Sequence, residues 1–369
     1  MAGETASNGP VMRIRYHGVR GSLPAPLTPL QVRKKMEVAV ETIFSSLVEM
    51  GNPACRSRLD ESPKLRIEYI SNLLDSMPLS VVGTYSGNTT CLEVQVKDSP
   101  LIVLDMGSGA RMLGNELAGR FFSPDKLGFN PLSTTDEFKN QIHVLLTHVH
   151  WDHIQGFPFF APAFFPGVDM KFYGRANSRQ TLEETLRGQQ QFPNFPVEFI
   201  DLPSSHDCKD IRRMAPPTIR IGAATINAVE LSHPDGVFAY KIEAGQGADK
   251  RIYVLATDTE HRDILDPRLV KLAKDAHILY YDAQYLPGAD YAGKFDWGHS
   301  TYEWAVKTAL AANVQTVVLG HFEPTRDDFG LAALHKDAVA FADAQLALPE
   351  NKGKFIRVVM GYEGLVQEL

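Results

Sequence analysis

Residues 145–157 read LLTHVHWDHIQGF, with His148, His150, Asp152 and His153 falling within six consecutive positions directly after an apolar run. In an extended segment the side chains at i and i+2 point the same way, so His148 and His150 can hold one metal ion. The following turn can then direct Asp152 and His153 to a second ion. Burying this much polarity without partners would be strongly unfavourable. The pattern therefore predicts a metal site.

Three further short apolar runs end in residues of the same kinds. TINAVELS leads to His233, RIYVLAT to Asp258 and TVVLG to His321. Imidazole and carboxylate without thiolate suit zinc, manganese or iron, and seven ligands are too many for one tetrahedral ion. Two ions that share a carboxylate can activate water and hold a phosphoryl or carbonyl oxygen, so the implied chemistry is hydrolysis. Taken singly, His233 or His321 could equally be a surface or hydrogen-bonded histidine.

The composition limits the class of protein. The chain has 369 residues, 44% of them hydrophobic and 22% charged, enough for one large or two ordinary globular domains. The net charge of −7 provides no global positive field, so we expect no bulk nucleic-acid binding. Three cysteines without C-x-x-C spacing favour a reducing compartment. With no secretory pattern and no apolar run long enough for a membrane span, we expect a soluble, cytoplasmic protein.

Strand and helix patterns occur in both halves of the chain. Runs rich in β-branched residues predict buried strands, and residues 300–314 predict a helix capped by Ser300 or Thr301. We expect sheets covered by helices, in one domain over residues 11–369 after a disordered tail at residues 1–10. The strands expected are residues 11–19, 89–96, 101–109, 141–147, 225–231, 251–257, 277–283 and 315–320.

Residues 28–80 predict a helical insertion between strands. An apolar stripe with steps of three and four residues marks its first helix. We expect a helical hairpin near the mouth of the site or at a subunit interface, where the stripe would cap the pocket or form a homodimer surface. The stripe consists of Val32, Met36, Val40, Ile43, Phe44 and Leu47.

The quoted motifs resemble those of a known family. THVHWDH, followed by SHPDG, ATDTE and LGHFEP, resembles the metallo-β-lactamase superfamily, in an arrangement similar to its ribonuclease Z and phosphodiesterase branch. The likeness runs from about residue 12 to the C-terminus and excludes the helical insertion. It implies an α/β fold, a four-layer αββα sandwich with a dinuclear site at one edge, zinc being the first candidate metal. Carried over, the resemblance assigns His148, His150 and His233 to one metal, Asp152, His153 and His321 to the other, and Asp258 as the bridge.

The resemblance also suggests catalytic residues. FDWGHSTYEWA is similar to the motif that protonates a leaving alkoxide in the phosphodiesterase branch, so His299 is the candidate general acid. YYDAQY nominates Asp282 as its partner, and Asp152 counts as catalytic as well as metal-binding. A backbone-bonded histidine and a surface or capping carboxylate are the alternatives. Ribonuclease Z usually has Glu where Asp282 stands, and no flexible Gly/Pro arm is recognisable, so we do not expect RNA processing.

Two further motifs, YSGNTTCLEV and LDMGSGAR, match the same branch. They suggest that Ser86, Asn88 and Thr89 donate hydrogen bonds near a substrate phosphate, with Asp105 supporting the metal ligands. A hairpin turn and a helix N-cap are the alternatives. Arg20 is a phosphate contact or, equally, a structural salt bridge.

These observations favour a dinuclear metal hydrolase that acts as a phosphodiesterase on a small phosphodiester such as a cyclic nucleotide. Acyl hydrolysis of a thioester, lactone or β-lactam on the same fold is the second hypothesis, and it needs no acid such as His299. A non-catalytic binding module is the third. The partner we expect is a small-molecule phosphodiester substrate, with no bulk nucleic-acid binding, no membrane and a possible homodimer.

Overall fold

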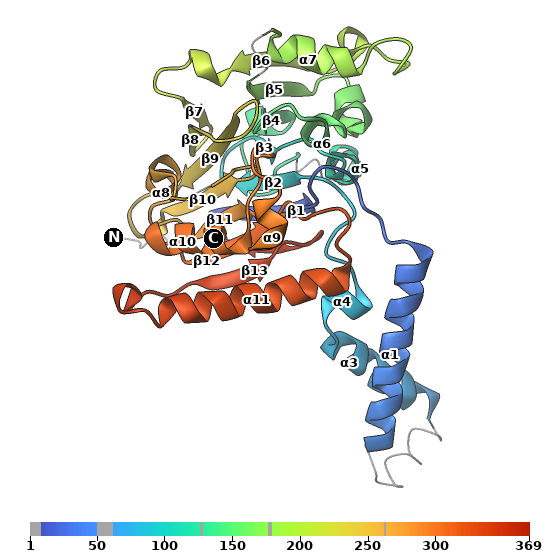
Figure 1. Ribbon diagram of the computed structural model, residues 1–369. Helices are drawn as coiled ribbons and strands as arrows, with labels where there is room; N and C mark the ends of the chain where they lie inside the picture. The colour runs from blue at the N-terminus through green and yellow to red at the C-terminus, as the bar shows by residue number, and fades with distance from the viewer. Residues whose placement is uncertain (1–8, 50–61, 126–127, 176–178, 262) are drawn as a thin grey trace, which may run out of the picture.

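The structure, a computed structural model, describes residues 9–49, 62–125, 128–175, 179–261 and 263–369. Two mixed sheets lie face to face, and helices cover their outer faces (Figure 1). This arrangement confirms the αββα sandwich expected from the sequence. Residues 1–8 of the tail predicted to be disordered lie outside the described residues.

The first sheet has seven strands in the order β14-β1-β2-β3-β4-β5-β6. Its first four strands pair antiparallel, and β3 to β6 pair parallel. The carboxyl ends of the parallel strands therefore meet at one edge of the sheet. The strands are β1 (Met12–Gly18), β2 (Cys91–Val96), β3 (Leu101–Leu104), β4 (Gln141–Leu145), β5 (Asp169–Gly174), β6 (Ser205–Asp210) and β14 (Val366–Glu368).

The second sheet repeats this plan in the order β13-β12-β11-β10-β9-β8-β7. Strands β7 to β10 pair antiparallel, and β10 to β13 pair parallel. The strands are β7 (Thr218–Ile221), β8 (Ala224–Leu231), β9 (Val237–Ala244), β10 (Arg251–Ala256), β11 (Ile278–Asp282), β12 (Thr316–Gly320) and β13 (Arg357–Met360).

Helices form the two outer layers. On the first sheet lie α5 (Gly109–Phe121), α6 (Trp151–Ile154) and α7 (Leu182–Gln189), and on the second α8 (Pro267–Leu272), α9 (Ala289–Ala292), α10 (Tyr302–Ala311) and α11 (Asp328–Leu346). Within the described residues, no helix is long and apolar enough to cross a membrane. The 3₁₀ turns are η1 (Asp136–Phe138), η2 (Phe157–Phe159), η3 (Ala161–Phe164), η4 (Phe199–Asp201), η5 (Ile211–Arg213), η6 (Gly247–Asp249) and η7 (Pro349–Asn351).

The core between the sheets is rich in tyrosine. Tyr16, Tyr253 and Tyr280 are fully buried, and the rings of Tyr16 and Tyr280 stack across the two sheets with centroids 5.9 Å apart. Burial of such a side chain contributes roughly 1.5–3 kcal/mol. Because this core lies directly beneath the strand ends, it fixes the relative position of the two edges that carry the polar residues.

The segment after β1 carries three helices, α1 (Pro29–Glu49), α3 (Pro63–Ser76) and α4 (Leu79–Val82). Helices α1 and α3 extend away from the sandwich (Figure 1). Three residues of the stripe stay largely open, since Met36, Val40 and Phe44 are 62%, 64% and 65% exposed. Residues 50–61, between α1 and α3, lie outside the described part of the chain. That this segment is an independent insertion covering a pocket or an interface stays a prediction.

A buried ion pair joins this segment to the sandwich. The Nζ atom of Lys35 lies 2.6 Å from Oδ2 of Asp328 at the start of α11. It also donates to the backbone oxygens of Ser80 and Gly83, at 2.8 and 2.6 Å. Lys35 and Asp328 are 6% and 1% exposed, and Nη2 of Arg20 lies 4.0 Å from Oδ1 of Asp328, so Lys35 is the nearer of two cations that compensate this carboxylate.

Replacing Lys35 by Ala should destabilise the protein by up to about 3–5 kcal/mol, because it removes the nearer cation from the buried carboxylate of Asp328. Denaturant unfolding measures this loss, and limited proteolysis should cut α1 and α3 sooner than in the wild type. Arg33→Ala is the control, because its exposed pair with Glu37 is worth only about 0.5 kcal/mol. Equal stability of the two variants would contradict the anchoring role.

Candidate metal centre

Three histidines from the facing sheet edges form the first cluster. His148 and His150 follow β4, and His233 follows β8. Their ring centroids lie 4.5–4.8 Å apart, and Nε2 of His233 is 3.0 Å from Nδ1 of His150. The structure thus brings together three residues that the resemblance assigned to one metal, across 83 residues of sequence.

The second cluster adjoins the first. Nε2 of His153, in α6, lies 3.2 Å from Nε2 of His321, which follows β12. Oδ2 of Asp152 is 3.2 Å from the first of these nitrogens and 3.3 Å from the second. Asp152, His153 and His321 are all buried. They therefore offer one carboxylate and two imidazoles to a second ion.

Asp258 lies between the clusters. Its Oδ2 is 3.6 Å from Nε2 of His148 and 3.3 Å from Nε2 of His153, and its Oδ1 is 3.2 Å from Nε2 of His321. A carboxylate that faces both ligand sets at once has the geometry required of a bridge. This position supports the bridging assignment, which stays a proposal.

The hydrogen bonds of the histidines test whether cations fit. Three Nδ1 atoms face oxygen acceptors: His153 faces Asp105 at 2.8 Å, His233 faces the Gly298 carbonyl at 2.9 Å and His321 faces Gln284 at 2.9 Å. An acceptor at Nδ1 assigns the N–H to that atom and directs the Nε2 lone pair into the centre. Converging lone pairs repel one another unless a cation lies between them. Nε2 of His148 is likewise buried with no hydrogen-bond partner, so the donor set fits divalent metal ions.

The charges of the centre follow from its burial. Burial lowers the pKa of His148, and the neighbouring His153 lowers it further. Burial opposes ionisation of Asp258, but His153 and His321 outweigh it and hold the pKa of that carboxyl well below its usual range. Burial lowers the pKa of His321 as well, yet Asp258 and Asp152 reverse the balance and raise it to about 8. Metal ions must displace protons here, so metal affinity falls as the pH falls.

Backbone geometry aims several of these groups inward. Asp105, Asp258 and His321 follow strands β3, β10 and β12, and their φ angles are 58°, 53° and 54°. This left-handed region is uncommon for residues other than glycine, although Asp and His enter it more readily than most. Each such residue costs on the order of 1–3 kcal/mol, which the rest of the fold must offset.

His299 and Asp282 lie at the same centre. Nδ1 of His299 is 3.0 Å from Oδ2 of Asp282 and 3.9 Å from Oδ2 of Asp258. The other oxygen of Asp282 accepts a hydrogen bond from the backbone N–H of Gln284 at 2.9 Å, and this contact fixes the carboxylate. The His299 ring stacks on that of His321, with centroids 5.0 Å apart. This arrangement suits an oriented acid, although His299 also lies close enough to Asp258, Asp282 and His321 to join a ligand set.

The expected substrate contacts are engaged within the protein. Ser86 and Asn88 bind the carboxylate of Glu363, and the Thr89 hydroxyl donates to the Asp152 carbonyl at 2.7 Å. The buried guanidinium of Arg20 donates to three backbone carbonyls. Nη2 of Arg20 also lies 4.0 Å from Oδ1 of Asp328. These contacts favour the turn and structural salt-bridge alternatives, and a substrate contact by any of the four residues stays an untested prediction.

Asp105 lies where a supporting role requires. It binds Nδ1 of His153 and accepts from the amide of Thr147, at 2.8 and 2.7 Å. Its carboxylate is fully buried. It can therefore fix both the orientation and the tautomer of His153.

Sequence reasoning missed three residues of the centre. Gln284 faces His321, and Gly298 accepts from His233 while its own amide donates to Glu260 at 2.9 Å. Gln284 stands two positions after Asp282 and Gly298 directly before His299, so both lie in motifs already singled out. No spacing rule indicates their contacts, because the partners are remote in sequence.

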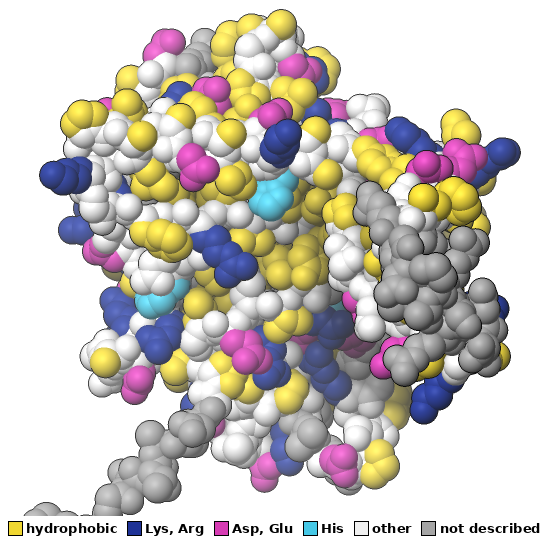
Figure 2. All heavy atoms as spheres, turned by 90° about the horizontal axis from the view of Figure 1, so that it is seen from below, with side chains coloured by type: hydrophobic (Ala, Val, Ile, Leu, Met, Phe, Trp, Pro, Cys, Tyr) yellow, Lys and Arg dark blue, Asp and Glu magenta, His cyan; other side chains and the backbone are white. Residues whose placement is uncertain are grey.

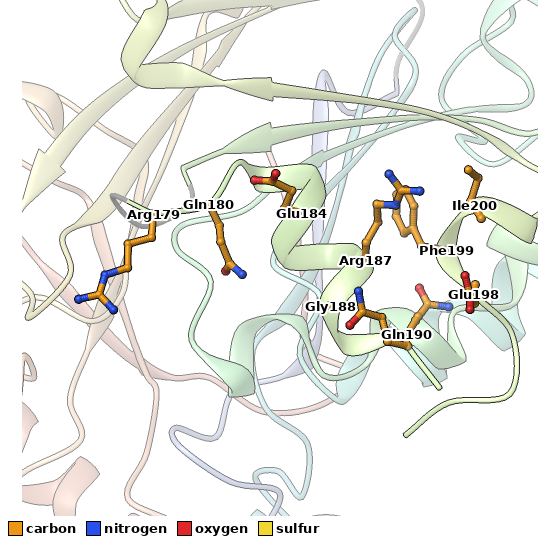
Figure 3. Close-up of a pocket in the computed structure, with 10 residues that line it drawn as sticks. Arg179, Gln180, Glu184, Arg187, Gly188, Gln190, Glu198, Phe199 and Ile200 are labelled. Atoms are coloured by element: carbon orange, nitrogen blue, oxygen red, sulfur yellow. The ribbon is translucent and has the colours of Figure 1, made fainter. Parts of the chain in front are cut away.

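Two hollows adjoin the candidate metal ligands. A cavity of about 840 Å³ is lined by His233, Gly298 and residues of the loop after β10. A smaller hollow of about 140 Å³ is lined by His148 and His150. A further pocket of about 420 Å³, lined by residues of α7 and of the segment after it (Figure 3), includes none of the candidate ligands.

The sequence model of the Beta-lactamase superfamily domain matches residues 113–322, and the chain belongs to this superfamily. The match confirms the resemblance to its metallo-β-lactamase members, and the chain is a metal-dependent hydrolase of that class. The fold implies divalent metal ions, which agrees with the converging donors described above.

Three relatives illustrate the likeness. Ribonuclease Z from Leuconostoc mesenteroides is 24% identical over 227 residues, covering 52% of this chain and 71% of the relative. The metallo-β-lactamase fold protein YhfI from Bacillus subtilis superposes with a TM-score of 0.55 at 15% identity, over 97% of this chain and 99% of that one. Yeast PDE1 superposes with a TM-score of 0.52 at 12% identity, over 98% and 100% of the two chains. At these identities, the two structures show the fold alone.

The expectation of no bulk nucleic-acid binding was wrong. Curated relatives from Leuconostoc mesenteroides and Oenococcus oeni are both named Ribonuclease Z, and the name refers to RNA. The error was to treat net charge as decisive, whereas nucleic-acid binding depends on where cations lie. On the face in Figure 2, Lys and Arg side chains stand among acidic and apolar ones despite the net charge of −7.

The purified protein should carry about two divalent ions per chain, since a shared carboxylate joins two sites. Asp258→Ala should lower metal content and activity together, as measured by elemental analysis and hydrolysis of an activated diester. Asp275→Asn, at an exposed carboxylate remote from the centre, should change neither. Metal content should also fall as the pH is lowered. A fully active protein with one ion would contradict the bridge.

Gly298→Ala should disturb the first cluster. A Cβ atom at this position would lie 2.0 Å from Nδ1 of His233, and the φ angle of 86° disfavours any side chain. We expect lower metal content and slower hydrolysis without global unfolding, checked by elemental analysis and circular dichroism. Gly293→Ala is the matched control, because its nearest neighbour would be 3.7 Å away. A Gly298→Ala protein with full metal content would refute this coupling.

Proposed function

We propose that the protein is a dinuclear metal phosphodiesterase and that its substrate is a small phosphodiester such as a cyclic nucleotide. One observation carries the proposal: His299, held by Asp282, lies beside Asp258 at the centre. An alkoxide leaves poorly without a proton, and a histidine can supply one near neutral pH. Acyl transfer from a thioester, lactone or β-lactam does not require this group.

Two sets of side chains would each hold one metal ion. His148, His150 and His233 would hold one ion, and Asp152, His153 and His321 the other, with Asp258 between them. Divalent ions at this place supply Lewis acidity toward a phosphoryl oxygen and lower the pKa of water. We take zinc as the first candidate, with manganese and iron as alternatives, because the donors are imidazole and carboxylate.

The side chain of His299 can hold and transfer one proton. With Nδ1 directed at Asp282, the free Nε2 atom is the one that can face a leaving oxygen. The carboxylate of Asp282 orients the ring. Asp282 thus acts through His299 and does not itself touch the substrate.

RNA is a second candidate substrate. The observation in its favour is the name Ribonuclease Z on the curated relatives. Both candidates require cleavage of a phosphodiester by the same centre. A panel with cyclic nucleotides, a precursor transfer RNA and a thioester separates the two from each other and from acyl hydrolysis.

His299→Ala should reduce hydrolysis of an alkyl phosphodiester by about 10²–10⁴-fold, because the alkoxide loses its proton donor. A p-nitrophenyl phosphodiester should be affected much less, since nitrophenolate leaves without a proton. Metal content should stay unchanged. Steady-state kinetics on both substrates and elemental analysis measure these effects.

Asp282→Asn should also slow hydrolysis of the alkyl phosphodiester more than that of the p-nitrophenyl phosphodiester, by a smaller factor than His299→Ala. His335→Ala, on α11 and outside the centre, is the control and should affect neither substrate. Equal losses on both substrates, or a fall in bound metal, would mean that His299 binds substrate or metal. Cleavage of the thioester but no diester would replace the proposal by acyl hydrolysis.

A further inference from the structure

Each histidine proposed as a ligand has a partner for the ring nitrogen that turns away from the metal centre. Such a partner determines which nitrogen carries the proton and how the ring is oriented, and metal affinity depends on both. In every one of these histidines except His150, the outer nitrogen is Nδ1. The partners of these Nδ1 atoms are Thr147, Asp105, the Gly298 carbonyl and Gln284, for His148, His153, His233 and His321 respectively.

His150 is oriented the other way. Its Nδ1 atom lies 3.0 Å from Nε2 of His233, on the side of the centre, so its outer nitrogen is Nε2. That nitrogen lies 3.5 Å from Oδ2 of Asp235. A carboxylate at the outer nitrogen favours a proton there and leaves the Nδ1 lone pair for a metal ion. Asp235 therefore stands to His150 as Asp105 stands to His153.

One turn carries both a proposed ligand and this carboxylate. Residues 233–236 read HPDG, with Pro and Gly at the second and fourth positions, as a type I turn favours. The amide of Gly236 donates to the carbonyl of His233 at 2.8 Å and closes the turn. Arg175 packs so closely on Gly236 that a Cβ atom there would overlap its guanidinium. The turn is thus held where it presents His233 to the first ion and Asp235 to another ligand of the same ion.

The contact between His150 and Asp235 is open to solvent. Their side chains are 39% and 72% exposed, and both line the hollow of about 140 Å³. An exposed ion pair adds little to folding stability, so removal of the Asp235 carboxylate should leave the fold intact. Its effect should fall on the orientation of the ligand and hence on metal affinity.

We propose that Asp235 is a positioning residue for metal binding: it orients His150, fixes a proton on Nε2 and raises the affinity of the first cluster for its ion. The inference deepens the proposed function, because it rests on the assignment of His148, His150 and His233 to one ion. Asp235 acts through His150 and is not itself a ligand. The second cluster does not contain His150, so we expect the effect at one ion of the two.

Asp235→Ala and Asp235→Asn test this role in the zinc-loaded protein, by competition with a chromophoric chelator. Asp235→Ala should raise the Kd of one ion by about tenfold, the lower end of the range for such outer partners, because the pair is exposed. The other ion should keep its wild-type Kd. Asp235→Asn retains an acceptor without the charge, so its Kd should be intermediate. Its difference from the wild type should shrink at high ionic strength, because salt screens an exposed charge.

The ¹⁵N NMR signals of the histidine rings report the orientation directly. In the zinc-loaded wild type the proton of His150 should lie on Nε2, and in Asp235→Ala it should exchange faster with water. Asp207→Ala is the matched control, because it removes an exposed carboxylate that is paired with Lys209 on β6. It should change neither Kd nor the spectrum. Circular dichroism of the metal-saturated proteins should be the same for all variants.

His150→Ala separates this inference from the ligand assignment. If His150→Ala binds less metal while Asp235→Ala keeps both wild-type Kd values, Asp235 has no positioning role and the ligand assignment stands. A proton on Nδ1 of His150 in the loaded protein also overturns the inference. If His150→Ala itself keeps both wild-type Kd values, the ligand assignment fails and the inference with it. Weakened binding of both ions in Asp235→Ala, or an equal effect in Asp207→Ala, would mean a general effect on the protein and would refute the role of Asp235.

Discussion

The convergence of imidazole lone pairs on a buried centre is the constraint on which this structure depends. Nε2 atoms of His153 and His321 lie 3.2 Å apart while their Nδ1 atoms are engaged by Asp105 and Gln284. Such an arrangement is unfavourable without a cation, and it is held in place by both sheets. The fold therefore holds polar groups close together at its strand ends, and divalent ions compensate the repulsion between them.

The sandwich makes this possible because its two sheets are built on one plan. Each changes from antiparallel to parallel pairing in mid-sheet, which gathers strand ends at a single edge. The Tyr16–Tyr280 contact fixes one edge against the other. The left-handed turns at Asp105, Asp258 and His321 then direct the side chains into the gap. Packing, and not the ligands themselves, sets the positions of the two clusters.

How much the sequence could predict depended on how local each signal was. Four ligands within residues 148–153 predict a metal site unaided, and alternating Met12, Ile14 and Tyr16 predict a strand with one buried face. Asp258 and His321 are candidates because they follow apolar runs, but each stands alone in its segment, so their assignment to the bridge and to the second metal needed the family resemblance. The sequence did not indicate the role of Gln284, because its contact with His321 spans 37 residues. It did not indicate the role of Gly298 either, because its contact with His233 spans 65 residues. Contacts of that kind require the fold, as does the saturation of Arg20 by backbone carbonyls.

The peptide of Gly298 connects the candidate metal ligand His233 to the proposed proton donor His299. Its carbonyl fixes His233, its amide is fixed by Glu260, and it precedes His299. Only glycine fits, because a Cβ atom would overlap His233. A displacement of this unit would therefore move the candidate ligand His233 and the proposed proton donor together. The cavity of about 840 Å³ is lined by this glycine and by His233, so it lies against the peptide that connects the two.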